Sequence, residues 1–325
     1  MIPFVLALVV ALLSTWWMVS GRSRLSIMDH PNERSLHASP VPRSGGVAIL
    51  LGILAGWGWL SVEQSVPAPL QWIMWAAMTV AGISLLDDLF ELSARVRLPV
   101  HILAAVLVLL GGISLPWGWP GWIMTLFGIV WMLNLYNFMD GMDGFAGGMA
   151  LAGFAFLGIG GYLTGDLTYA WWSWAVAAAA SGFLLFNVPP ARIFMGDAGS
   201  ATLGLLAAAL SLWGVHKGLF PLWFPLMVFS PFWVDATVTL IRRACRREKV
   251  WQAHREHYYQ RLIRAGWSHR KTVTMEYLLM IASGGSALLL LVYPGWWIVG
   301  LLVWGGIYLI LARMVDLFFA RRQVG

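Results

Sequence analysis

Five aspartates in this chain lie at the edges of apolar stretches, where a membrane protein rarely carries charge. They are Asp87, Asp88, Asp140, Asp143 and Asp197. An ionised side chain within a membrane span costs roughly 2.5 to 3.5 kcal/mol on insertion scales, so it persists when it is paired, solvated or functional. Five carboxylates gathered at one face of a bilayer would suit a divalent metal ion and a bound phosphate. Their positions therefore predict a metal and phosphate site.

One segment, NFMDGMDGFAGG, carries two of these acids at a regular spacing. Asn137, Asp140 and Asp143 follow one another at intervals of three residues, so on a helix or a tight helical end they share a face. Mg²⁺ prefers oxygen ligands, usually one or two carboxylates together with waters and substrate phosphates. Taken singly, Asp143 and Asp197 also have a simpler interpretation as helix N-caps.

Two polar segments supply cations. The first, residues 28–46, contains Asn32, Arg34, His37 and Arg43, and the second, residues 253–270, contains His254, Arg255, His257, Arg261, Arg264 and His269. A surface of arginine and histidine that faces an acidic, metal-bearing surface would bind an anionic substrate. The alternative is that these are solvated loops. The glycines lack the lysine of a Walker A loop and the preceding strand of a dinucleotide fingerprint, so soluble nucleotide-binding folds are excluded.

The composition places these segments in a membrane protein. Of 325 residues, 59% are hydrophobic and 11% are charged, and the mean hydropathy is +0.74. This predicts an all-α, polytopic integral membrane protein, a single transmembrane domain over residues 1–325. The single Cys245 excludes an internal disulfide and a Cys-based metal site. About eleven spans (ten to eleven) are expected, at 2–20, 46–61, 70–86, 99–115, 121–137, 145–163, 169–186, 198–215, 220–241, 273–293 and 296–318.

The basic residues orient these spans. With eleven spans, Lys217 alone among 21 Lys and Arg falls on the side opposite the five aspartates. By the positive-inside rule, the aspartates face the cytoplasm and the N-terminus lies outside. The net charge of +6 then indicates topology and attraction to anionic membrane lipids, not nucleic-acid binding. Asp235 is near the same face, and Arg242 or Arg243 is its expected partner.

Four segments resemble the signature loops of the polyprenyl-phosphate N-acetylhexosamine-1-phosphate transferases (glycosyltransferase family 4 type). They are DDLFELSARVR, NLYNFMDGMDGFAGG, NVPPARIFMGDAGSATLG and PNERSLHASPVPRSGG, and the likeness extends from about Asp29 to Lys271. The resemblance implies that undecaprenyl phosphate attacks the β-phosphorus of a UDP-N-acetylhexosamine and UMP leaves. It also implies Mg²⁺ as the cofactor, with Mn²⁺ as a substitute ion, and a bacterial inner membrane location.

The resemblance further implies roles for individual residues. Asp197 is expected to be the principal metal ligand, with Asn187 and Asp88 close by. Direct attack by the lipid phosphate is favoured over a covalent phospho-enzyme, but both stay open. The catalytic group is expected to contain Asp87, Asp88, Asp140 and Asp143, and the substrate-binding group Asn137, Arg43, His254, Arg255, His257 and Arg261.

Departures from the family pattern reduce the number of sugar donors to be expected. Leu89 follows the aspartate pair and the histidines are spread as HREHYYQR, whereas the peptidoglycan branch has three successive aspartates and three successive histidines. This argues against a muramoyl-pentapeptide donor. Resemblance to the transferases that initiate lipopolysaccharide O-antigen predicts a 6-deoxy sugar such as N-acetylfucosamine (FucNAc) or N-acetylquinovosamine (QuiNAc), or else GlcNAc for this or another envelope polymer.

Three further possibilities belong to other classes or states. A cation-coupled transporter would place its acids near the bilayer midplane, in broken helices and an inverted repeat, and the sequence shows none of these. A catalytically inactive lipid-binding relative would be expected to have lost an aspartate, and all five are present. Many tryptophans near the expected span ends leave room for a homodimer.

Overall fold

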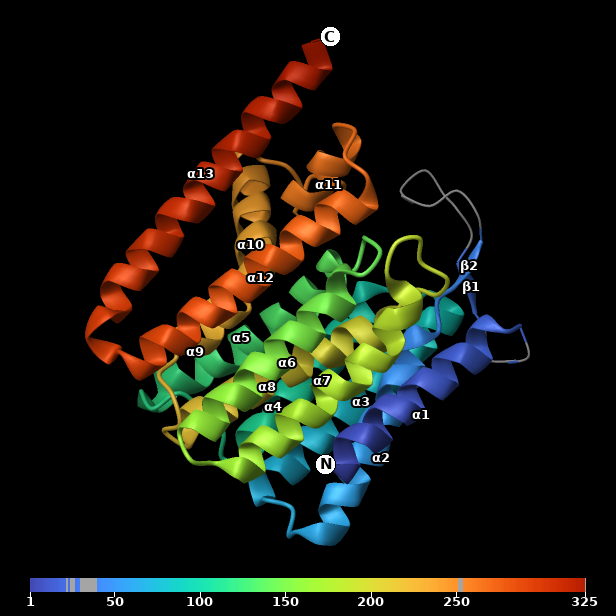
Figure 1. Cartoon of the computed structure of the whole chain (residues 1–325), viewed down its shortest axis with the longest axis vertical. Coiled ribbons are helices and arrows are strands. Elements are labelled where there is room, and N and C mark those ends of the chain that lie inside the picture. Colours follow the sequence, from blue (N-terminus) through green and yellow to red (C-terminus); the bar gives the residue numbers. More distant parts are fainter. Residues whose placement is uncertain (22, 24–26, 30–39, 251–253, 325) are drawn as a thin grey trace.

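The chain folds into a bundle of helices (Figure 1). This computed structural model describes every residue except 22, 24–26, 30–39, 251–253 and 325, and only the backbone at 322–324. The described helices are α1 (Ile2–Val19), α2 (Gly45–Glu63), α3 (Ala68–Phe90), α4 (Ala94–Leu110), α5 (Gly118–Met139), α6 (Phe145–Leu163), α7 (Leu167–Asn187), α8 (Asp197–His216), α9 (Trp223–Val228), α10 (Ser230–Cys245), α11 (Tyr258–Arg264), α12 (His269–Val292) and α13 (Trp297–Val324), with a short 3-10 helix η1 (Pro294–Trp296).

The predicted all-α, polytopic architecture is confirmed. All eleven expected spans fall on helices, and within the described part of the chain nine helices are long and apolar enough to cross a membrane. The other two expected spans correspond to α4, which has 17 residues, and to the pair α9 and α10. That pair was predicted as one helix but breaks at Phe229. Pro231 has no N–H to continue the hydrogen-bond ladder, so a new helix begins there.

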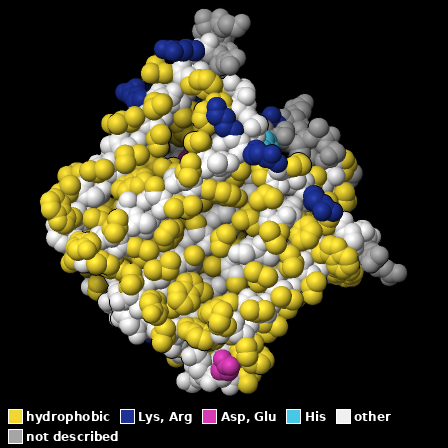
Figure 2. All heavy atoms as spheres, in the orientation of Figure 1, with side chains coloured by type: hydrophobic (Ala, Val, Ile, Leu, Met, Phe, Trp, Pro, Cys, Tyr) yellow, Lys and Arg dark blue, Asp and Glu magenta, His cyan; other side chains and the backbone are white. Residues whose placement is uncertain are grey.

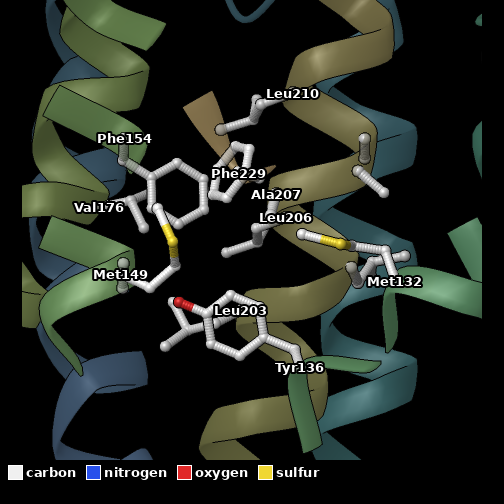
Figure 3. Close-up of a cluster of buried hydrophobic side chains, with 14 of the residues drawn as sticks. Met132, Tyr136, Met149, Phe154, Val176, Leu203, Leu206, Ala207, Leu210 and Phe229 are labelled. Atoms are coloured by element: carbon white, nitrogen blue, oxygen red, sulfur yellow. The ribbon is translucent and has the colours of Figure 1, made fainter. Parts of the chain in front are cut away.

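Helix α8 forms the centre of the bundle. In its membrane-spanning window 94% of the residues are buried, against 28% for α1 at the periphery. Its small residues allow neighbouring helices to approach closely, and a Cβ at Gly204 would lie 2.7 Å from the Met132 carbonyl oxygen of α5. Figure 3 shows the core around it, where side chains of α5, α6 and α7 meet Leu203, Leu206 and Leu210.

Apolar side chains cover most of the surface in Figure 2, and the Lys and Arg side chains visible there lie toward the top and right. In Figure 1 this is the region of α11 and of the two short strands, β1 (Met28–Asp29) and β2 (Val41–Pro42). The strands pair antiparallel with Met28 opposite Pro42. The end of the bundle that carries this hairpin, the 140–144 and 188–196 loops and α11 is called the site face below. At the opposite end, Lys217 forms an ion pair with Asp166.

Candidate active site

The carboxylate of Asp88, at the end of α3, caps the first turn of α8. Oδ1 accepts a hydrogen bond from the backbone N–H of Asp197 and Oδ2 accepts one from Ala198, each at 3.0 Å. The first amides of a helix lack partners within the helix, so a buried carboxylate there satisfies them and interacts favourably with the helix dipole. Asp88 therefore fixes the start of α8 at the site face.

Gly196 makes this arrangement possible. Its φ is +73°, and a Cβ there would lie 2.2 Å from the carbonyl oxygen of Arg43. Any other residue would therefore clash with the backbone that follows β2. Arg43 completes the junction, because its Nη2 donates to the Asp88 carbonyl oxygen at 2.6 Å. The first polar loop, α3 and α8 thus meet at one point.

Asp197 lies at the centre of a polar cluster formed by three other helices. Its Oδ1 accepts a hydrogen bond from Asn137 Nδ2 of α5 at 2.7 Å, and its Oδ2 accepts one from Arg97 Nη1 of α4 at 3.0 Å. Arg97 Nη1 also forms an ion pair with Asp87 Oδ2. The Asp197 side chain is 34% exposed, whereas Asp87 is buried. Arg97 therefore bridges two carboxylates, one of which remains accessible.

Asp140 differs from its neighbours, since its carboxylate has no hydrogen-bond or ion-pair partner among the residues that the structure describes. It follows the last residue of α5, and it is partly accessible. Partial burial among the helix ends raises the pKa of Asp140 well above the usual range of an aspartate, and the negative charges of Asp197 and Asp88 raise it further. A cation at this point would reverse that effect.

Asn187 and Asp143, the other two predicted site residues in this region, connect two loops. Asn187, at the end of α7, accepts from the Gly144 N–H at 2.9 Å and donates to the Ile193 carbonyl at 2.8 Å. Asp143 Oδ2 accepts from the Ala191 N–H at 3.0 Å and lies 3.4 Å from His269 Nδ1. Both side chains therefore connect the 140–144 and 188–196 loops. A metal-ligand role for Asn187 stays a prediction.

The segment HREHYYQR packs beside this cluster, around α11. His257 is buried, and its Nδ1 lies 3.3 Å from Asp235 Oδ1 of α10. Asp235 also accepts from the backbone N–H groups of Tyr258 and Tyr259, at 2.9 and 3.2 Å. Tyr259 in turn reaches the Phe138 carbonyl oxygen at 3.4 Å. Contacts from Asp235 thus position the predicted substrate segment against the end of α5.

The expected partner of Asp235 was wrong. Arg242 forms an ion pair with Asp316 of α13, and Arg243 forms one with Glu248. The reason is that α11 folds back on α10 and brings its own backbone amides and His257 to Asp235. A spacing rule within one helix does not include such a contact.

The residues predicted in the two polar segments differ in whether their polar groups are already paired. Arg43 Nε and Arg255 Nη2 are buried N–H groups without a hydrogen-bond partner among the described residues, so both are able to donate to a bound anion. Arg261 points to α13 instead, where its Nη1 lies 2.5 Å from Asp316 Oδ1. Asn32, Arg34 and His37 fall outside the described residues.

His254 is neutral at physiological pH. Burial, with electrostatic contributions from the neighbouring His257 and Arg243 side chains, lowers the pKa of His254 to about 4. Its Nδ1 accepts from the Glu256 N–H at 3.3 Å, which leaves Nε2 as the protonated nitrogen. His254 is therefore a hydrogen-bond donor and not a cation.

A magnesium ion fits the residues present. No group of three or more His, Cys, Asp or Glu side chains forms a preassembled metal site in the described ranges. Mg²⁺ does not need one, because it binds through one or two carboxylates and fills its remaining positions with waters and substrate phosphates. Asp140, unpartnered, and Asp197, partly exposed, are the two carboxylates suited to this.

Arg97 is the residue that sequence reasoning missed. It lies in DDLFELSARVR, ten residues after Asp87, among arginines that the positive-inside rule alone accounts for. The available signal was its position two residues before the expected span 99–115, on the same side as the five aspartates.

The part of the chain that forms the aspartate cluster also matches a known protein family. The family described as Glycosyl transferase family 4 matches residues 70–215, which include all five aspartates and Arg97. A probable undecaprenyl-phosphate N-acetylglucosaminyl 1-phosphate transferase of Bacillus subtilis is 31% identical over 310 residues, covering 89% of this chain and 86% of the relative.

Two further relatives have related names. A decaprenyl-phosphate N-acetylglucosaminephosphotransferase of Mycobacterium tuberculosis is 31% identical, covering 79% of this chain and 74% of the relative. An undecaprenyl-phosphate alpha-N-acetylglucosaminyl 1-phosphate transferase of Escherichia coli K12 is 25% identical, with 78% and 73% covered.

Proposed function

Because the chain belongs to the polyprenyl-phosphate N-acetylhexosamine-1-phosphate transferase superfamily, of glycosyl transferase family 4, we propose that it transfers an N-acetylhexosamine 1-phosphate from a UDP-sugar to undecaprenyl phosphate. The observation that carries the proposal is the convergence of Asp197, Asp87 and Arg97 from three helices at the site face, next to the unpartnered carboxylate of Asp140.

In the proposed reaction the protein forms no covalent bond with either substrate. An oxygen of the lipid phosphate forms a bond to the β-phosphorus of the donor, and the bond between that phosphorus and the bridging oxygen of the α-phosphate breaks. UMP leaves with the electron pair. Since the second pKa of a phosphate is about 6, the lipid phosphate is largely dianionic at neutral pH and no strong base is required. We favour this direct attack over a covalent phospho-enzyme.

Positioning and charge neutralisation then supply the catalysis. Asp88 holds the first turn of α8, so that Asp197 keeps its place. The unpaired N–H groups of Arg43 and Arg255 are suited to phosphate oxygens, and Arg97 brings a third guanidinium to the cluster. A Mg²⁺ ion held by Asp197 and Asp140 would neutralise the charge of the diphosphate.

We further propose that the site face lies at the cytoplasmic side of a bacterial inner membrane. The distribution of Lys and Arg supports this orientation through the positive-inside rule. Lys217, the exception, is bound to Asp166 at the opposite end.

Two donors are candidates. The names of the relatives support UDP-GlcNAc. The HREHYYQR segment supports a 6-deoxy donor, carrying FucNAc or QuiNAc, in O-antigen synthesis. A cation-coupled transporter has less support, because the acids meet at one end of the bundle and not at mid-depth.

The test is release of UMP by the protein purified in detergent. Undecaprenyl phosphate and Mg²⁺ are held constant while UDP-GlcNAc and the UDP-linked 6-deoxy sugars are compared. Release with one donor, dependent on the lipid phosphate, is the expected result and names the sugar. A folded protein that releases no UMP with any of these donors would contradict the proposal.

A further inference from the structure

The last helix, α13, contacts the predicted substrate segment, and both lie beyond residues 70–215, which the family model matches. Asp316 of α13 is the connecting residue. Its carboxylate accepts two contacts from Arg242 Nη1, at 2.7 and 2.9 Å, and one from Arg261 Nη1 at 2.5 Å. One carboxylate therefore joins three helices, since Arg242 belongs to α10 and Arg261 to α11.

Aromatic rings strengthen the same junction. The guanidinium carbons of Arg261 and Arg264 lie 4.9 and 5.4 Å from the centre of the Phe319 ring. The ring of the preceding residue, Phe318, meets the ring of Trp267 in an edge-on arrangement, with 6.2 Å between the ring centres. Cations over aromatic faces are attracted by the ring quadrupole, most strongly where water is partly excluded. The end of α13 thus contacts the C-terminal half of α11 and the loop that follows it.

The other side of α11 faces the aspartate cluster. Tyr259 contacts the Phe138 carbonyl oxygen, and a Cβ at Gly141 would lie 2.3 Å from the Tyr259 hydroxyl. Any displacement of α11 therefore alters the space beside Asp140. Elsewhere α13 contacts the bundle through Tyr308, whose hydroxyl lies 2.6 Å from Ser230 Oγ, and through Trp297, which stacks on Trp223.

We propose that Asp316 is a positioning residue, through which α13 sets the distance between the HREHYYQR segment and the aspartate cluster and so controls binding of the sugar nucleotide. The proposal rests on the proposed function, in which that segment contacts the donor. The Asp316 carboxylate is directed to Arg242 and Arg261. Its effect reaches the reaction through Arg261 and the position of Arg255 on the same segment.

The experiment measures UMP release by Asp316→Asn and by the unaltered protein. The KM for the UDP-sugar and the KM for undecaprenyl phosphate are determined separately for each. We expect the KM for the UDP-sugar to rise about tenfold, because coupled charged contacts of this kind are worth a factor of several to a hundred. The KM for the lipid should change less than about twofold, and Asp316→Glu should restore most of the donor affinity.

The matched control is Asp166→Asn, which breaks an ion pair of the same type at the opposite end of the bundle. A second variant, Phe319→Leu, weakens the junction without removing a charge. If neither Asp316→Asn nor Phe319→Leu changes the donor KM, or if both KM values and the melting temperature change together, the positioning role is wrong.

A readout independent of turnover separates this proposal from the proposed function. Trypsin cleaves after arginine, and Arg261 and Arg264 lie within the held segment. Cleavage there should be faster in Asp316→Asn than in Asp166→Asn, in detergent and without substrate. Absence of UMP release by the unaltered protein would contradict the proposed function alone, whereas equal cleavage of the two variants would contradict the hold of α13 on α11.

Discussion

The carboxylate of Asp88 accepts a hydrogen bond from the backbone N–H of Asp197 at 3.0 Å, although the two residues are 109 positions apart in the chain. The contact ties the last turn of α3 to the first turn of α8. It leaves the Asp197 side chain free to face the site, where Asn137 and Arg97 hold its two oxygens. The two neighbouring aspartates therefore have different roles. Asp88 binds the backbone at the start of α8, and Asp87 forms an ion pair with Arg97.

Replacement of Asp88 by Asn should reduce turnover about a hundredfold while the protein stays folded. An amide has one acceptor oxygen, so its NH₂ group would face one of the two backbone N–H groups that it now caps. Loss of a helix cap costs about 1 to 2 kcal/mol, which a buried bundle tolerates. The measurement is kcat together with a melting curve in detergent. A variant with normal kcat would show that the cap is dispensable for catalysis.

Asp197→Asn should abolish UMP release without loss of folding or membrane insertion. The amide keeps the size of the side chain and the contact with Asn137, but it cannot carry the negative charge that a divalent cation needs. Lys217→Ala, at the far end of the bundle, should leave turnover unchanged, because partly exposed ion pairs contribute about 0 to 1 kcal/mol. Full activity of the Asp197 variant would remove this residue from the proposed metal site.

Arg97→Ala should lower kcat about 100- to 1,000-fold, the range for removal of one preorganised charge-stabilising group. Its side chain is the cation between Asp87 and Asp197, so its removal leaves two carboxylates facing each other. Arg97→Lys should recover part of the activity, since a lysine provides the charge without the planar fork. Equal rates for the Ala and Lys variants would indicate that charge at this position does not matter.

Activity should depend on Mg²⁺ and on pH together. The raised pKa of Asp140 means that this carboxyl binds its proton at a higher pH than an ordinary aspartate, so protons compete with the metal more strongly. As pH falls through that range, the Mg²⁺ concentration for half-maximal activity should rise. Chelation should stop turnover, and added Mg²⁺ should restore it.

In Asp140→Asn, which has no titrating carboxyl at this position, the Mg²⁺ requirement should be about 10- to 100-fold higher at neutral pH and should vary less with pH. Titrations of both proteins across the same pH range provide the check. Identical curves would place the metal elsewhere.

Much of this architecture was predictable from the sequence. Apolar stretches of span length predicted the positions of the long helices, with α9 and α10 taken as one. The five aspartates were expected at one face, and Asp88 does contact the first turn of α8 there, while Asp143 contacts the 188–196 loop. Such predictions depend on the apolar composition of each stretch and on the side of the membrane to which each loop is assigned. Both can be read from the sequence.

The partners of individual side chains were harder to predict from the sequence. Asp235 was assigned to arginines on its own helix, but α11 supplies its partners by folding back. Arg97 was overlooked because a membrane protein places arginines at this face for topology alone, and no pattern separates a functional arginine from those. The break at Phe229 depended on Pro231, one of three prolines within the predicted span 220–241.

The dispersal of the site along the chain has a consequence for biogenesis. Arg43 precedes the second helix of the bundle, whereas His269, which contacts Asp143, begins the twelfth. The side chains that form the site are therefore spread from the segment before α2 to the start of α12. If they bind phosphate as proposed, a chain that is still being inserted lacks the complete site until α12 has been made.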